Sequence, residues 1–175
     1  MTLEVRPARP EEFDEVGHVT ALAYREFVRP GETAWEDYLE HIADTEGRAD
    51  RTMILIAVEH GRVLGSATLE LTDRIEDEGR PLHPEEAHVR MLGVHPDARR
   101  RGIAKLLMAG CEQQARTAGK AFLTLHTTQR MIAAQTMYAS LGFEREEDHV
   151  FPDGFVLLGY SKRIVPGATG QSREG

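Results

Sequence analysis

Mostly apolar residues recur at helical spacing through the first quarter of the chain, which predicts that they share one face of a helix. Before them, the extended stretch LEVRPA at residues 3–8 is typical of a strand. Pro10 is expected to open a helix, because a proline at the first helical position gives up no hydrogen bond. The face that follows comprises Phe13, Val16, Thr20, Ala23, Tyr24 and Phe27. Thr33 and Glu36 have the spacing of a capping box, which predicts a second helix with the apolar stripe Trp35, Tyr38, Leu39 and Ile42.

Extended patterns replace the helical ones between residues 52 and 94. The runs TMILIAVE at 52–59 and RVLGSATLEL at 62–71 flank His60 and Gly61, which is the arrangement of a β-hairpin with a tight turn. The polar run 72–85 is expected to be a loop, and AHVRMLGV at 87–94 reads as another strand. This part of the chain therefore predicts three strands.

Helices and strands alternate in the second half of the chain. An amphipathic helix is expected from Ile103 to a point near Gly119, then a strand at 121–127 and a helix at 131–141 that Gly142 closes. Residues 145–150 and 155–164 are expected to form a hairpin around the turn FPDG. Hairpins mixed with helical crossovers predict one α/β domain over residues 1–164, a mixed central sheet of about seven strands flanked by four helices on both faces. Residues 165–175 are expected to be a disordered tail.

Composition narrows the classes of function. The net charge of −8 argues against general nucleic-acid binding, which needs a basic face. No apolar run reaches the length of about 18 residues that a membrane span needs, and the N-terminus lacks the apolar core of a secretion signal. The one cysteine, Cys111, fits a reducing compartment and is expected in the core. The histidines show no metal-ligand spacing. We therefore expect a cytoplasmic protein without a metal that binds neither nucleic acid nor a membrane.

Three consecutive arginines precede Gly102 at the start of the predicted helix. The first amides of a helix lack partners and its dipole is positive there, so a glycine loop followed by a helix can bind a pyrophosphate. The letters do not fit a Walker loop, because Ala104 rather than glycine precedes Lys105, and they lack the three spaced glycines of a dinucleotide fingerprint. On these residues alone, a solvated basic loop is an equally good interpretation.

Two motifs then resemble one family. The segment MLGVHPDARRRGIAKLLM resembles the acetyl-CoA-binding segment of the GNAT superfamily of N-acetyltransferases, with Arg99, Gly102 and Ala104 in the defining positions of its Arg/Gln-x-x-Gly-x-Gly/Ala signature. The segment AAQTMYASLGFERE resembles the family's Ala-x-x-x-Tyr-x-x-x-Gly-Phe helix, with matching residues Ala134, Tyr138, Gly142 and Phe143. The order of the predicted elements from Leu3 to Ile164 also matches the family.

The resemblance implies a binding site for acetyl-CoA as co-substrate. In the family, backbone groups at the end of the fourth strand pair with the pantetheine arm, and Leu92, Gly93 and Val94 occupy that place here. Backbone amides of the following loop would hold the pyrophosphate of coenzyme A. That loop comprises Arg99, Arg100, Arg101, Gly102, Ile103 and Ala104.

The resemblance also implies direct attack of a neutral amine on the thioester, without an acyl-enzyme. Tyr138 matches the family's general acid for the leaving thiolate; the alternative is an aromatic that only packs on the sheet. His88 stands where many members carry a glutamate, and an imidazole could accept the amine's proton. Glu86 should face the same side of the strand. The alternative for His88 is a strand histidine without a catalytic role.

Two departures from the family bear on the acceptor. Met131 replaces the asparagine that often begins the tyrosine-bearing helix. The run His126-Thr127-Thr128 replaces the Glu-Val-Arg run usual in enzymes that acetylate protein N-termini. Both changes favour a small-molecule amine as acceptor. Acetylation of a protein lysine or N-terminus, and a non-catalytic acyl-CoA-binding sensor, are the alternatives. The resemblance also favours a homodimer.

Overall fold

The structure is a computed structural model that describes residues 2–72, 74–75 and 79–165. Its α-helices are α1 (Phe13–Tyr24), α2 (Thr33–Ala43), α3 (Thr45–Ala49), α4 (Ile103–Thr117) and α5 (Ile132–Ser140). Short 3-10 turns occur at Pro10–Glu12, Arg25–Phe27 and Pro96–Ala98. The strands are β1 (Glu4–Pro7), β2 (Met53–Glu59), β3 (Arg62–Glu70), β4 (Arg74–Ile75), β5 (Arg80–Pro81), β6 (Glu86–Val94), β7 (Phe122–Thr127), β8 (Glu144–Arg145), β9 (His149–Val150) and β10 (Val156–Arg163).

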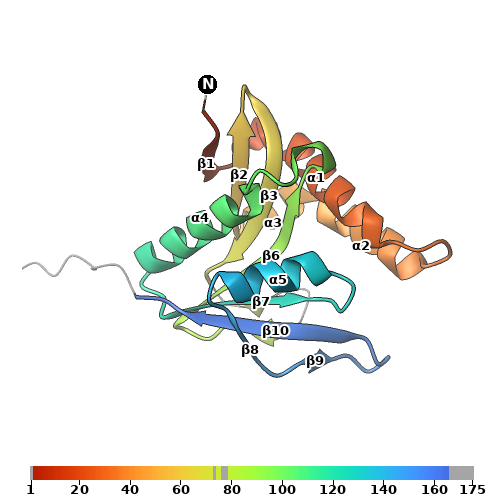
Figure 1. Cartoon of the computed structure of the whole chain (residues 1–175), viewed down its shortest axis with the longest axis vertical. Helices are drawn as coiled ribbons and strands as arrows, with labels where there is room; N and C mark the ends of the chain where they lie inside the picture. Colours follow the sequence, from red (N-terminus) through yellow and green to blue (C-terminus); the bar gives the residue numbers. More distant parts are fainter. Residues whose placement is uncertain (1, 73, 76–78, 166–175) are drawn as a thin grey trace, which may run out of the picture.

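The strands form one central sheet in the order β1-β2-β3-β6-β7-β10-β8, with β9 paired to β10 (Figure 1). Neighbours are antiparallel except β6 and β7, which are parallel and joined through α4. The predicted mixed α/β sheet is thus confirmed. The strands β4 and β5 form a separate two-stranded ribbon.

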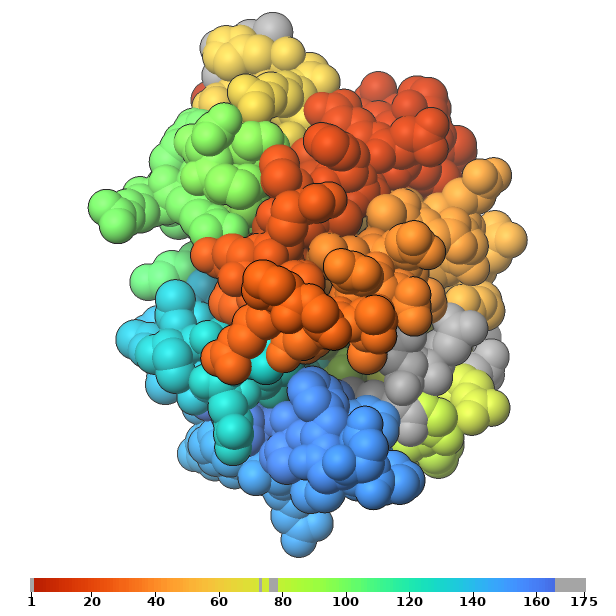
Figure 2. Space-filling view, turned by 90° about the vertical axis from the view of Figure 1, so that its right-hand side faces the viewer, coloured from red at the N-terminus to blue at the C-terminus, as the bar shows by residue number. Residues whose placement is uncertain are grey.

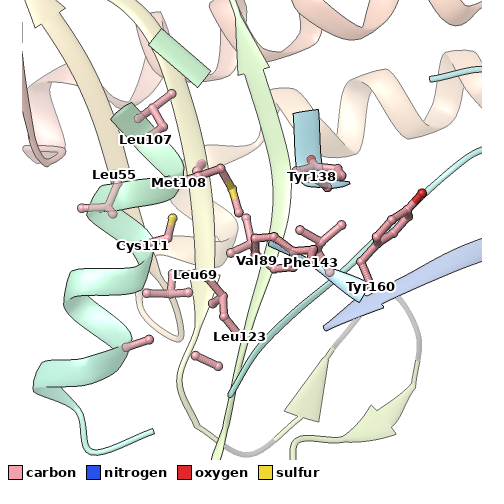
Figure 3. Close-up of a cluster of buried hydrophobic side chains, with 14 of the residues drawn as sticks. Leu55, Leu69, Val89, Leu107, Met108, Cys111, Leu123, Tyr138, Phe143 and Tyr160 are labelled. Carbon is pink, nitrogen blue, oxygen red and sulfur yellow. The ribbon is translucent and has the colours of Figure 1, made fainter. Parts of the chain in front are cut away.

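Apolar side chains on both faces of the sheet hold the layers together. Along β2, Leu55 and Ala57 join the core formed with α4, whereas Ile54 and Ile56 pack in a second cluster with α1. This alternation is the period of a strand buried on both faces. Figure 3 shows the larger core, in which Cys111 lies on the buried face of α4 as expected.

The sheet opens between β6 and β7. These strands are paired only from Glu86 to Val89 on β6 and from Phe122 to Leu125 on β7, although β6 continues to Val94. A β-bulge follows at once, because two residues of β6, Met91 among them, lie opposite the single Ala67 of β3. Met91 has a φ of 53°, an uncommon value for a residue with a side chain. The bulge and the short pairing together separate the two strands at this end of the sheet.

Several local predictions need correction. Glu32, not Thr33, is the N-cap of α2, and no side chain forms the predicted capping bond there. The helix after Pro10 begins as a 3-10 turn and its α-helical part ends at Tyr24. The predicted loop at 72–85 contains β4 and β5, and the predicted strand at 145–150 is divided into β8 and β9. Residues 166–175 of the predicted tail lie outside the described residues.

Candidate active site

A layer of polar side chains lies on the face of the sheet that α1 and α2 cover. Glu86, His88 and Arg90 alternate along β6 and are all buried. Because side chains two apart on a strand share a face, all three point to the same side. On β7, Thr124 is the register partner of His88. The sequence reasoning that placed Glu86 on the side of His88 therefore holds, and their side chains approach to 3.9 Å between Glu86 Oε1 and His88 Nδ1.

Hydrogen bonds connect these side chains. His88 Nδ1 lies 2.8 Å from Thr124 Oγ1, and Thr124 donates to Glu86 Oε1 at 2.6 Å. Arg80 donates to both carboxylate oxygens of Glu86, at 2.6 and 3.1 Å. Burial acts to raise the pKa of Glu86, but the bonds from Arg80, Thr124 and the backbone of His83 outweigh it and hold that pKa below its ordinary value. Glu86 is therefore a carboxylate at neutral pH.

His88 lines a pocket of about 430 Å³ between α2 and the β9–β10 hairpin, here called the α2–hairpin pocket. Figure 2 shows α2, in orange, facing the blue hairpin across a hollow. Its inner end is formed by β6 and β7, and its walls are mainly aromatic and apolar. The lining residues are Tyr24, Ala34, Trp35, Tyr38, Ile75, His88, Arg90, Met91, His126, Thr127, Thr128, Met131, Phe151, Asp153, Phe155 and Leu157.

An ion pair joins the start of α2 to the segment before α5. Arg130, just before α5, donates to both oxygens of Glu32 at 2.9 and 2.7 Å and to the carbonyl of Phe27 at 3.1 Å. Its guanidinium also lies 5.9 Å from the centre of the Trp35 ring. The hydrogen bond from Arg130 is the main cause that lowers the pKa of Glu32 to about 2. These contacts, which sequence reasoning missed, hold Trp35 in the pocket wall.

Tyr138 is buried in the larger core, outside the lining of the α2–hairpin pocket. Its ring contacts Phe143 and Tyr160, with centroids 5.9 and 5.8 Å away (Figure 3). Burial raises the pKa of Tyr138 above its usual range, so the phenol carries its proton at neutral pH. The structure thus brings Glu86 and His88 together and places Tyr138 beyond the pocket wall.

The loop before α4 presents its backbone outward. Arg100 and Gly102 both have left-handed φ values, 63° and 76°, and a Cβ added at Gly102 would meet nothing within 4 Å. The two flanking arginines are engaged by carboxylates: Arg99 pairs with Glu26 at 2.8 Å, and Arg101 with Glu59 at 2.8 Å. The predicted anion site therefore consists of amides at the start of α4 beside Arg100, with Arg99 and Arg101 held to neighbouring elements.

The residues at the end of β6 are placed by the bulge. Leu92 and Val94 pack against the core on the α4 side, and Gly93 faces α1, where an added Cβ would lie 2.9 Å from that of Ala23. Only a glycine lets α1 approach this closely. The backbone of this segment lies past the β6–β7 pairing, which ends at Val89.

Two polar partners of the site were missed by sequence reasoning. The alternation of FLTLHT places Thr124 and His126 on the polar face of β7, but it does not show which residue of β6 lies opposite Thr124. Arg80 gave no such signal, since it lies in the run predicted as a loop. Within the described ranges, no cluster of three or more His, Cys, Asp or Glu side chains could hold a metal ion. No helix in the described part of the chain is both long and apolar enough to cross a membrane.

Comparison with known proteins places this chain in a family. The model of the acetyltransferase (GNAT) family matches residues 17–143. An acetyltransferase of Sodalis glossinidius is 29% identical over 163 residues, which cover 93% of this chain and 96% of that protein. The PaiA N-acetyltransferase of Thermoplasma acidophilum, solved in complex with coenzyme A, superposes with a TM-score of 0.72 at 16% identity and covers 94% of this chain and 100% of its own. The acetyltransferase yncA of Salmonella typhimurium, solved with acetyl-CoA, gives 0.68 at 17% identity, over 98% of this chain and 99% of its own. The family match spans most of the chain and includes both motifs, and the chain therefore belongs to the GNAT family of acetyltransferases.

Proposed function

We propose that this enzyme transfers an acetyl group from acetyl-CoA to a primary amine of a small molecule, by direct attack in a ternary complex. The observation that carries the proposal is the position of His88. Its side chain is 1% exposed, yet it lines the α2–hairpin pocket beside the bulge of β6, where the sheet opens. A titratable group at the closed end of an apolar pocket is a strong candidate for a catalytic base.

The loop and the strand edge support acetyl-CoA as the co-substrate. The amides at the start of α4, with Arg100 and the open space at Gly102, suit a pyrophosphate. From there, the backbone from Arg90 to Val94 leads along the opening between β6 and β7 to the pocket. In this arrangement the nucleotide lies on the α4 side, and the thioester reaches His88 from the side opposite the pocket mouth.

The reaction needs two proton transfers. The amine nitrogen attacks the thioester carbonyl and forms a C–N bond, while its proton passes to His88. Collapse of the tetrahedral intermediate breaks the C–S bond, and Tyr138 donates its proton to the departing thiolate. The high pKa of Tyr138 keeps the phenol protonated until the sulfur develops charge. Cys111 takes no part, because it lies in the core and burial raises its pKa to about 12.

The walls of the pocket support a small acceptor. Trp35 and Tyr38 of α2 face Phe151 and Phe155 of the hairpin, and Arg130 with Glu32 fixes the α2 side. A volume of about 430 Å³ is the size of a small-molecule site. Aromatic walls bind an apolar or aromatic body, and the amine can then point toward His88.

The experiment is thiol release from acetyl-CoA with a panel of small primary amines and of lysine-containing and N-terminal peptides. We expect release with at least one small amine. Tyr138→Phe should slow that release by about 10²-fold or more, the usual contribution of a general acid, and leave acetyl-CoA binding nearly unchanged. Tyr160→Phe is the matched control, since Tyr160 is buried against Tyr138 and is not used in the mechanism.

Each other outcome of this experiment identifies an alternative. Release with peptides alone would replace the small acceptor by a protein. Acetyl-CoA binding without release from any member of the panel would support a sensor. Equal slowing by Tyr138→Phe and Tyr160→Phe would remove Tyr138 from the chemistry and leave it a packing residue.

A further inference from the structure

The bonds around His88 have a defined direction. Arg80 occupies both oxygens of Glu86 as a donor, and the lowered pKa of Glu86 keeps it a carboxylate, which accepts hydrogen bonds and donates none. At 2.6 Å, the contact between Thr124 Oγ1 and Glu86 Oε1 therefore uses the single hydroxyl hydrogen of Thr124. Charge-assisted bonds of this kind are short and strong, so that hydrogen is committed to Glu86.

This direction determines the hydrogen bond to the imidazole. With its hydrogen given to Glu86, Thr124 Oγ1 can only accept from His88 Nδ1, which lies 2.8 Å away. Nδ1 must then carry the hydrogen. In the neutral ring one nitrogen is protonated and the other is not, so the lone pair stands on Nε2.

We propose that Thr124 and Glu86 are positioning residues that hold neutral His88 as the Nδ1–H tautomer, so that Nε2 is the atom that takes the proton from the acceptor amine. The catalytic half of this inference rests on the proposed function, whereas the tautomer does not. The arrangement works as a carboxylate does behind a catalytic histidine, with a threonine hydroxyl inserted between the two. Glu86 lies 3.9 Å from His88 Nδ1 and also stabilises the imidazolium that proton transfer creates.

Other titratable groups also lie near His88. Glu70 is the register partner of His88 on β3, and its Oε1 lies 3.3 Å from Arg90 Nε. The ring of His126 lies 5.3 Å from that of His88, centroid to centroid. His88 Nδ1 lies within hydrogen-bond distance of Thr124 Oγ1, and Thr124 is therefore the residue to change.

The direct test is the pair of imidazole nitrogen chemical shifts of His88, measured by NMR on protein labelled with ¹⁵N-histidine near neutral pH or above. His88→Gln identifies the signals by removing them. We expect the wild type to show a protonated Nδ1 and a bare Nε2. Thr124→Val, which has almost the same shape, should shift the population toward the other tautomer, and Thr124→Ser should restore the wild-type shifts. Wild-type shifts in Thr124→Val would overturn the proposal.

The catalytic half is tested by the rates of the same variants with the best amine of the panel. Thr124→Val should lower kcat by about 10-fold to 10²-fold, because much of the ring then presents a protonated Nε2. The KM for acetyl-CoA should stay within about twofold, and Thr124→Ser should recover most of kcat. Equal loss in Thr124→Ser and Thr124→Val would contradict a role through the hydroxyl.

The NMR shifts test the tautomer of His88, and the rates test His88 as the catalytic base, so the two parts of the proposal can fail separately. A changed tautomer with an unchanged kcat would overturn His88 as base and leave acetyl transfer intact. If Thr124→Val does not fold, Glu86→Gln provides the second variant. Its neutral amide removes the charge that orients the Thr124 hydroxyl, and the same shift toward the other tautomer is expected; an unchanged tautomer there would also overturn the proposal.

Discussion

Among single residues, the buried Arg48 ties the end of α2 to the sheet. Arg48 of α3 is 2% exposed and donates to the carbonyls of Ile42 and Asp44, at 2.9 and 3.0 Å, and to Thr68 of β3 at 3.1 Å. The last carbonyls of a helix lack partners within it and carry the negative end of its dipole. Arg48 therefore supplies hydrogen-bond donors to the carbonyls at the end of α2 and ties this end to the sheet. These bonds fix the helix that carries Trp35.

Replacement of Arg48 should cost much of the stability. We expect Arg48→Met to lower the free energy of unfolding by about 2–4 kcal/mol, because it leaves buried carbonyls without their charged donor. Arg51→Met removes the same charge at an exposed position three residues away and should change stability by less than about 0.5 kcal/mol. Urea unfolding of both variants makes the measurement. Losses of equal size would show that Arg48 contributes only its charge.

The sequence predicts the relative position of two site residues when both lie on the same strand. The alternation of β6 puts Glu86 beside His88, and this holds in the structure. Thr124 and Arg80 could not be assigned as partners in that way, because each joins Glu86 across strands whose register the sequence does not specify. The role of Arg48 was missed for a similar reason, since a charged residue in a short helix resembles a solvated one.

At the scale of elements, the two ends of α4 offer a comparison. Gly102 is its N-cap and Gly119 follows its C-cap, and both have a φ of 76° with open space around an added Cβ. Their backbone conformations thus require glycine for the same reason. Only Gly102 lies in the proposed pyrophosphate loop, so the pair separates the cost of backbone strain from the loss of acetyl-CoA.

Alanine at either position should lower the stability of the unliganded protein by roughly 1–2 kcal/mol, the cost of a left-handed non-glycine residue. Acetyl-CoA at about 100 times its dissociation constant should stabilise the wild type and Gly119→Ala by about 2.7 kcal/mol. Gly102→Ala should show a clearly smaller gain, because the added methyl group stands where the phosphates approach. Thermal unfolding with and without acetyl-CoA measures both effects. An equal gain in the two variants would place the pyrophosphate elsewhere.

Long elements follow from the sequence, and short ones do not. The stripes of α1 and α4 and the hairpin of β2 and β3 bury apolar faces, so local patterns predict them. The buried Ile42 and the half-buried Tyr38 and Leu39 mark the stripe of α2. The five residues of α3 and the two-residue strands β4 and β5 have no such face of their own. They form through contacts made elsewhere, such as the bonds of Arg48 to α2 and of Arg80 to Glu86.

Across the whole molecule, the opening between β6 and β7 would give the two substrates of the proposed reaction separate approaches. The loop before α4 lies on one side of it, and the α2–hairpin pocket on the other. The element order predicts the mixed sheet that makes this opening, because a parallel pair amid hairpins requires a helical crossover. The bulge at Met91 and the shape of the pocket depend on packing between distant segments, so the sequence did not predict them.

Mass spectrometry of both the amine and the protein tests whether the acetyl group passes directly from acetyl-CoA to a small amine. The enzyme is incubated with acetyl-CoA and the best amine of the panel, then separated from the small molecules. We predict an amine heavier by one acetyl group, a protein of unchanged mass, and a yield that Tyr138→Phe strongly reduces. An acetyl group found on the protein, or an amine of unchanged mass while acetyl-CoA is consumed, would contradict direct transfer to the amine.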